Sequence, residues 1–131
     1  MSAAPAKSSR PRPKYYDLNL AHLPAPGLLS IFHRASGIAL FLVIPLLLFI
    51  FHQSMQSDAG FAKWQGIFAM PLVKLVLLGF VWSYMHHFFA GIRYLLLDVH
   101  VGVAKEPAQT SAKVVIVLGV LATLAIGVCI W

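Results

Sequence analysis

The chain of 131 residues contains a single cysteine, Cys129. One thiol cannot form a disulfide within the chain, and it supplies too few thiolates to hold an iron-sulfur cluster. The sequence also lacks a glycine-rich loop of the GxGxxG or GxxxxGK type, so it offers no recognisable site for a nicotinamide, a flavin or ATP. We therefore expect no catalysis by this chain alone, and we predict no catalytic residue in it.

Charged residues are also scarce. They make up 11% of the chain, whereas hydrophobic residues make up 60%. A soluble domain has about 25% charged residues, so this composition predicts an all-α integral membrane protein. The formal net charge of +6 comes from basic residues that flank apolar segments, which indicates membrane topology and contact with lipid. We do not expect binding to nucleic acid.

Three segments have the roughly 20 apolar residues that are needed to cross a bilayer core of about 30 Å. The predicted membrane helices cover about residues 28–52, 70–98 and 113–131, with short polar connections between them. Together they form one membrane domain at 28–131, preceded by a tail at 1–27. Pro45 is expected to bend the first helix, whereas Pro71 suits the first turn of the second.

The distribution of basic residues predicts the orientation, because lysine and arginine beside membrane helices are retained in the cytoplasm. The N-terminal tail and the second connection are the more basic, so we expect a cytoplasmic N-terminus and a C-terminus outside. No apolar signal-peptide core precedes Leu28, which predicts an uncleaved tail. The basic residues that support this topology are Lys7, Arg10, Arg12, Lys14, Arg34, Arg93, Lys105 and Lys113.

Two clusters of polar and ionisable residues interrupt the apolar segments. A charge at the middle of a membrane helix costs about 2.5 to 3.5 kcal/mol on insertion scales, so such residues usually have a task or a partner. We expect the chain to handle electrons or protons. The clusters are Ser30, His33 and Arg34 in the first segment, and His86, His87, Arg93 and Asp98 in the second.

His87 lies about ten residues from the cytoplasmic end of its helix, roughly 15 Å deep and near the bilayer centre. It could simply hydrogen-bond a neighbouring helix, or it could ligate a haem. Ala90 and Gly91 would clear one helix face for a flat macrocycle, and Ser83 is placed to orient the ring. His86 points about 100° away, so the two cannot bind one iron from opposite sides. Helical spacing leaves open which of them is the ligand.

A six-coordinate haem needs a second axial ligand, for which this chain offers His33, His52 and His100. Their predicted depths argue against all three. His33 is about 7 Å inside the cytoplasmic end, and the other two lie near opposite membrane faces. We therefore expect a partner subunit to supply the second ligand.

The first cluster has two interpretations, because spacings of three and four residues place Ser30, His33 and Arg34 on one side of a helix. In one, Ser30 caps the helix and Arg34 extends to the interface. In the other, they form a small polar pocket for the carbonyl oxygens of a quinone or the propionates of a haem. The residues alone leave both interpretations open.

Two motifs occur in order along the chain. The first comprises Arg12-Pro13, Asp17-Leu18 and SIFHRASG from Ser30 to Gly37, and the second is HHFFAGIRYLLLD from His86 to Asp98. Together they resemble one known family, the cytochrome b membrane-anchor subunit of succinate dehydrogenase, respiratory complex II. With the three-helix layout, the similarity extends from Arg12 to the end of the chain.

The resemblance implies a role for each motif residue. It implies that His87 is an axial ligand of haem b, shared with a second small membrane-anchor subunit that supplies the other ligand. It also implies roles for five further residues: Ser30 and Arg34 in binding ubiquinone, His33 and Arg93 near the haem propionates, and Asp98 as an acid of the quinone region.

The resemblance further implies a place in electron transport and the tricarboxylic acid cycle. Succinate would be oxidised in a flavoprotein subunit, and an iron-sulfur subunit would pass electrons to ubiquinone at this anchor. Flavin and iron-sulfur clusters would belong only to those partners. Because Arg12-Pro13 lies too near Met1 to leave room for a transit peptide, we expect the complex in a bacterial inner membrane. The alternatives are the anchor of a fumarate reductase, working in the reverse direction, and a haem-free structural anchor.

Overall fold

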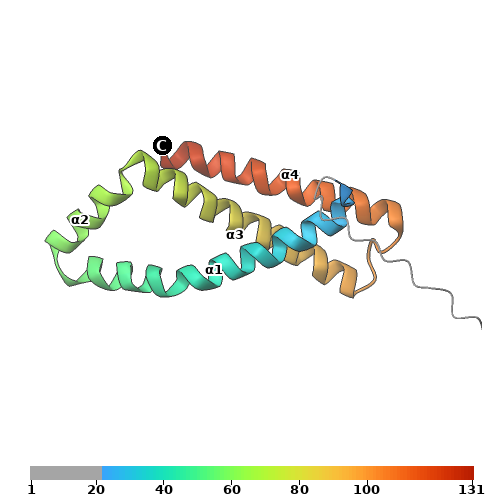
Figure 1. The fold of residues 1–131 in the computed structure, drawn as a ribbon, viewed down its shortest axis with the longest axis horizontal. Helices are drawn as coiled ribbons and strands as arrows, with labels where there is room; N and C mark the ends of the chain where they lie inside the picture. The colour runs from blue at the N-terminus through green and yellow to red at the C-terminus, as the bar shows by residue number, and fades with distance from the viewer. Residues whose placement is uncertain (1–21) are drawn as a thin grey trace, which may run out of the picture.

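The computed structural model describes residues 22–131, which fold into four helices (Figure 1). They are α1 (Ala25–Gln56), α2 (Asp58–Phe68), α3 (Pro71–Asp98) and α4 (Lys105–Ile130). The first, third and fourth are long and apolar enough to cross a membrane. The prediction of three membrane helices is thereby confirmed. Most of the predicted tail, with Arg12-Pro13 and Asp17-Leu18, lies outside the described residues.

Two membrane helices begin earlier than the sequence suggested. Helix α1 begins at Ala25, directly before Pro26 in its first turn. Helix α4 begins at Lys105, so Pro107 lies in its first turn instead of in a connection. Proline is tolerated there because the first N–H groups of a helix have no intrahelical partner. Pro45 lies inside α1, which is visibly curved (Figure 1).

The connection expected between the first two spans is present, but it contains a short helix, α2, that the sequence analysis did not predict. The Ser57 hydroxyl accepts a hydrogen bond from the Gly60 N–H at 3.0 Å and caps the helix. Asp58 in the first turn adds a favourable interaction with the helix dipole. Trp64 packs edge-on against Phe49 of α1, with ring centroids 6.4 Å apart. Helix α2 thus closes the wide end of the gap between α1 and α3 (Figure 1).

Helices α3 and α4 lie side by side, whereas α1 meets α3 at one end and diverges from it towards α2 (Figure 1). Small residues permit the close contact of α3 with α4: a Cβ atom at Gly119 would lie 3.4 Å from the His86 Cα, and one at Gly127 would lie 3.0 Å from a Leu78 methyl carbon. Glycine at helix contacts allows backbones to approach in this way. The buried apolar core is small and lies where α1, α3 and α4 meet; it consists of Leu29, Ala90, Ala112 and Val115.

The chain reverses sharply after α3. The Val101 N–H donates to the Leu96 carbonyl at 2.9 Å, and the His100 N–H donates to the Leu97 carbonyl at 2.9 Å. His100 has a φ of 63°, the left-handed conformation that ends many helices in this pattern. The turn sends the chain back along α3 as α4.

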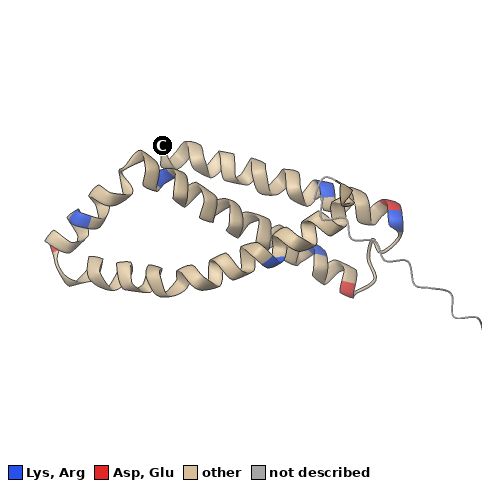
Figure 2. Ribbon diagram, in the orientation of Figure 1, with Lys and Arg blue, Asp and Glu red and all other residues tan. Residues whose placement is uncertain are grey.

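Charged residues gather towards the ends of the helices (Figure 2). No Lys, Arg, Asp or Glu occurs in the ranges 35–57, 75–92 or 114–131. An uncharged middle is what a hydrocarbon core demands. The histidines of the second cluster are therefore the ionisable side chains that most need an explanation.

Replacing Gly119 with Val should push α4 away from α3, because the added side chain would meet the His86 backbone. Overpacking of this kind costs about 1 to 3 kcal/mol, so the thermal midpoint of the purified complex should fall. Gly79→Val is the matched control, since a Cβ there meets nothing within 4 Å among the described residues. Equal midpoints for the two variants would contradict the packing.

Candidate functional site

His33 of α1 and His87 of α3 lie face to face where these two helices meet. Their rings stack with centroids 4.2 Å apart and planes within 10° of parallel. The two clusters that the sequence analysis treated separately therefore meet at one place. Arg34 contributes to the same surface, because it lines a cleft together with both histidines.

The sequence-based estimate that His33 lies much closer to the cytoplasmic end of the bundle than His87 was wrong. His33 lies eight residues after the start of α1 at Ala25, roughly 12 Å along the helix, and His87 lies eleven residues before the end of α3 at Asp98, roughly 16 Å. The earlier start of α1 accounts for much of the difference. Rings stacked side by side cannot approach one iron from opposite faces, so this geometry still does not make His33 a second axial ligand.

The His87 ring is held through one nitrogen. Its Nδ1 lies 3.0 Å from the His33 carbonyl oxygen and 3.3 Å from the Ser36 hydroxyl. A carbonyl oxygen only accepts hydrogen bonds, so Nδ1 bears the proton. In the neutral ring, Nε2 then has the free electron pair that a metal requires.

Gly37 lets the ring come this close to α1. A Cβ atom at position 37 would lie 2.8 Å from the His87 Cε1, closer than side chains normally approach. Ser36 and Gly37 were not predicted to be parts of the site. The available signal was their position three and four residues after His33, which places small residues on the same side of α1.

The small residues after His87 do not have the predicted role. Ala90 is fully buried in the core contact between helices, so it does not clear a surface for a macrocycle. Gly91 faces the His33 ring, whose Nε2 would lie 3.9 Å from a Cβ at that position. Space beside His87 therefore comes chiefly from α1.

Ser83 does not orient the His87 ring, contrary to expectation. Its hydroxyl donates to the Gly79 carbonyl at 3.0 Å, within its own helix. A serine hydroxyl four residues after a carbonyl commonly makes this bond. The hydroxyl that reaches His87 is that of Ser36 on α1.

His86 is fully buried, in contrast to its partly exposed neighbour. Its ring stacks on Trp82 at 5.2 Å and meets Phe32 edge-on at 6.0 Å. Neither ring nitrogen has a hydrogen-bond partner within residues 22–131. Because α1 and α4 enclose it, His86 has no approach for a planar macrocycle, and the geometry selects His87 as the candidate ligand.

A cleft of about 450 Å³ opens beside His87 on the outer surface of α1 and α3. Its floor combines the two stacked imidazoles with the bare backbone at Gly37, and its apolar residues are largely exposed. A surface with imidazole, guanidinium and apolar groups suits a flat, amphiphilic ligand. The lining residues are His33, Arg34, Gly37, Ile38, Phe41 and His87.

Ser30 does not cap α1, because that helix begins five residues earlier with Pro24 at its N-cap. The capping interpretation is therefore wrong. Arg34 is exposed, and its Nε donates to the Ser30 carbonyl at 3.3 Å. This bond draws the guanidinium back along α1 towards the end of the bundle that carries most charges.

Arg93 faces α4. Its side chain is 5% exposed, with Nε donating to the Ser111 hydroxyl at 2.9 Å and a terminal nitrogen donating to the Ala108 carbonyl at 3.0 Å. These bonds fasten α3 to the first turns of α4. Asp98 is exposed as the last residue of α3.

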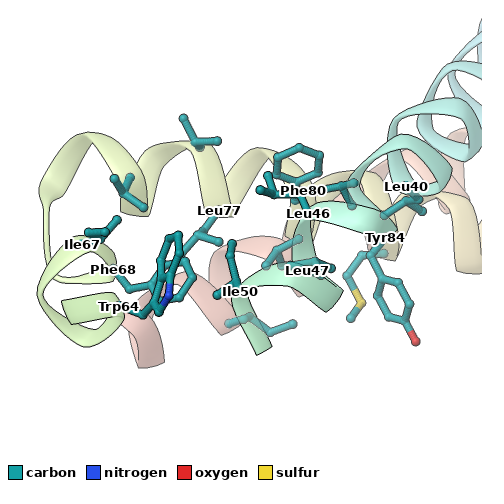
Figure 3. Close-up of a pocket in the computed structure, with 16 residues that line it drawn as sticks. Leu40, Leu46, Leu47, Ile50, Trp64, Ile67, Phe68, Leu77, Phe80 and Tyr84 are labelled. Carbon is teal, nitrogen blue, oxygen red and sulfur yellow. The ribbon is translucent and has the colours of Figure 1, made fainter. Parts of the chain in front are cut away.

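A second cavity, of about 500 Å³, lies between the diverging parts of α1 and α3 beneath α2 (Figure 3). Its lining is apolar apart from Tyr84, and it contains no residue of the two polar clusters. It is suited to apolar groups and offers no chemistry. Residues lining it include Leu40, Leu46, Leu47, Ile50, Trp64, Ile67, Phe68, Leu77 and Phe80.

Comparison with known proteins gives a consistent result. Residues 8–126 match the family model described as the succinate dehydrogenase/fumarate reductase transmembrane subunit. The succinate dehydrogenase cytochrome b556 subunit of Coxiella burnetii (strain RSA 493 / Nine Mile phase I) is 34% identical over 121 residues, covering 92% of this chain and 97% of the relative.

Two further relatives have the same name. The succinate dehydrogenase cytochrome b556 subunit of Rickettsia bellii (strain RML369-C) is 31% identical, covering 76% of this chain and 78% of its own. That of Paracoccus denitrificans is 30% identical, covering 80% of this chain and 81% of its own. The similarity therefore spans more than three quarters of each of these three proteins.

Proposed function

Because the chain belongs to the succinate dehydrogenase/fumarate reductase transmembrane subunit family and is a cytochrome b556-type subunit of a succinate dehydrogenase complex, we propose that it binds haem b through His87. It takes part in electron transport and the tricarboxylic acid cycle as a subunit of that enzyme. The observation that supports His87 is the Nδ1 contact with the His33 carbonyl, which leaves Nε2 free beside an open cleft.

The residues present fit a haem. Gly37 provides a cradle that a Cβ would fill, His87 offers a nitrogen donor, and Ile38 and Phe41 offer apolar contacts. When bound, haem b supplies one-electron transfer. His33 lines the cleft and is proposed to lie near a propionate, whereas Arg93 would have to leave its partners on α4 to do so.

A second small membrane-anchor subunit is proposed to complete the haem site. The cleft is on the outside of the α1–α3 pair, and His33 stacks on the His87 ring, so of these two histidines His87 alone would hold the haem. A partner helix against this surface would supply the missing ligand and cover exposed apolar residues. Among the described residues, His52 and His100 do not line the cleft.

Ser30 and Arg34 are proposed to bind ubiquinone near the cytoplasmic end of α1, close to the iron-sulfur subunit. The Arg34 side chain is exposed, and its Nε donates to the Ser30 carbonyl. No hydrogen bond of its terminal nitrogens to another described residue is seen. Its terminal N–H groups can donate to a quinone carbonyl, and its charge stabilises the negative charge that develops there on reduction. Asp98, at the end of α3, is proposed as an acid of the same region.

Electrons would reach this site from an iron-sulfur subunit, which receives them from a flavoprotein subunit that oxidises succinate. The complex is proposed to lie in a bacterial inner membrane with the N-terminus of this chain cytoplasmic. The family model also includes fumarate reductase anchors, but the three relatives described above are all named for succinate dehydrogenase. We therefore favour succinate oxidation as the physiological direction.

Replacing His87 with Ala should abolish the b-type α-band in dithionite-reduced minus oxidised spectra of the purified complex, because the iron loses a ligand. His86→Leu is the matched control. His86 is buried, and its ring nitrogens have no hydrogen-bond partner in the described part of the chain, so an apolar replacement should leave the spectrum unchanged. An intact spectrum in the His87 variant would move the ligand elsewhere, and loss of haem only in the His86 variant would identify that residue.

Replacing Arg34 with Ala should reduce ubiquinone reduction by roughly a hundredfold, the typical effect of removing one donor to a developing oxyanion. Succinate oxidation by an artificial soluble acceptor should be unchanged, because that reaction does not use the anchor. Arg34→Lys keeps the charge and should retain more activity than Ala. Equal loss of both activities would contradict the quinone assignment.

The proposed orientation can be tested with the single cysteine of the chain. Cys129 lies near the C-terminal end of α4 and is exposed. A membrane-impermeant maleimide should label it in intact spheroplasts. In a Cys129→Ser background, Ser2→Cys should be labelled only after lysis, and the reverse pattern would place the N-terminus outside.

A further inference from the structure

Ser36 has a buried hydroxyl that connects α1 to the candidate ligand on α3. The residue is 3% exposed. Its hydroxyl donates to the His33 carbonyl at 3.0 Å, and its oxygen lies 3.3 Å from the His87 Nδ1. Because the hydroxyl proton is directed to the carbonyl, the oxygen presents an electron pair to the Nδ1–H.

We propose that Ser36 is a positioning residue that fixes the orientation and the tautomer of the His87 ring. This inference rests on the proposed role of His87 as a haem ligand. The Nδ1–H is shared between two acceptors, the His33 carbonyl and the Ser36 hydroxyl. Turning the ring over would place a C–H group against both acceptors and would lose both hydrogen bonds, so the ring is held with Nε2 as the free donor atom.

The neighbouring glycine makes this arrangement possible. Any side chain at Gly37 would collide with the His87 ring, so the imidazole can reach the Ser36 hydroxyl only over bare backbone. Ser36 and Gly37 thus act together: one supplies the acceptor and the other supplies the space.

The bond has a chemical consequence for a bound metal. Hydrogen-bond acceptors at the outer nitrogen of a ligating imidazole raise the basicity of the inner nitrogen. A more basic ligand favours ferric over ferrous iron and lowers the reduction potential. Ser36 is therefore expected to lower the midpoint potential of the haem as well as to strengthen its binding.

Ser83 provides a matched control within the same chain. It lies one turn before His87 on α3, but its hydroxyl is bonded to the Gly79 carbonyl. Ser83→Ala removes a serine hydroxyl close to His87 in the sequence but removes no hydrogen bond to the His87 ring.

The test compares the purified complex with Ser36→Ala, Ser36→Thr, Ser83→Ala and His87→Ala in this subunit. Haem content per complex and a redox titration of the α-band are measured for each. For Ser36→Ala we expect the midpoint to shift to more positive potential and haem affinity to fall, because one of the two acceptors at Nδ1 is lost. The fall in affinity should be only roughly tenfold, since the His33 carbonyl remains as the other acceptor. Ser36→Thr retains the hydroxyl and should restore both values, and Ser83→Ala should match the unaltered complex.

The outcomes separate this inference from the proposed function. An unchanged midpoint and haem content in Ser36→Ala, with haem lost in His87→Ala, would overturn the positioning role of Ser36 alone. An unchanged spectrum in His87→Ala would overturn the haem assignment itself. If Ser36→Ala does not assemble, Ser36→Cys fills similar space with a much weaker hydrogen-bonding group and allows the same comparison.

Discussion

The hydrogen bond between the His87 ring of α3 and the His33 carbonyl of α1 is the interaction on which the candidate site depends. It decides the tautomer, because a carbonyl can only accept, and it leaves Nε2 available to a metal. It also requires α1 and α3 to approach so closely that position 37 has no room for a side chain. The cleft, the candidate ligand and the contact between these helices are therefore parts of one arrangement.

The two adjacent histidines show how strongly the surrounding helices determine chemistry. His86 and His87 are identical side chains about 100° apart on α3. His86 is enclosed where α1, α3 and α4 meet, without a hydrogen-bond partner among the described residues, whereas His87 lies against the His33 carbonyl of α1 beside an open cleft. The His86 ring packs against the aromatic rings of Trp82 and Phe32.

Hydropathy was sufficient to predict the three membrane helices, because insertion depends on the summed apolar character of about 20 residues. Hydropathy did not predict α2, because its eleven residues of mixed polarity are too few and too polar to give a membrane-helix signal. The Ser57 cap, which marks the start of α2, was not recognised in the sequence. The start of α4 was missed because Pro107 and its charged neighbours suggested a connection, although a first turn accepts all of them.

The sequence by itself determined the class of protein, the number of spans, the family resemblance and the short list of polar residues that any site must use. The resemblance already implied His87 instead of His86 as the ligand. Only the tertiary structure brought Ser36 and Gly37 to the His87 ring and directed Ser83 and Arg93 to other partners. The physical reason is the range of each effect. Membrane insertion adds contributions along one chain segment, whereas a hydrogen bond of about 3 Å exists only where two helices meet in a particular rotation.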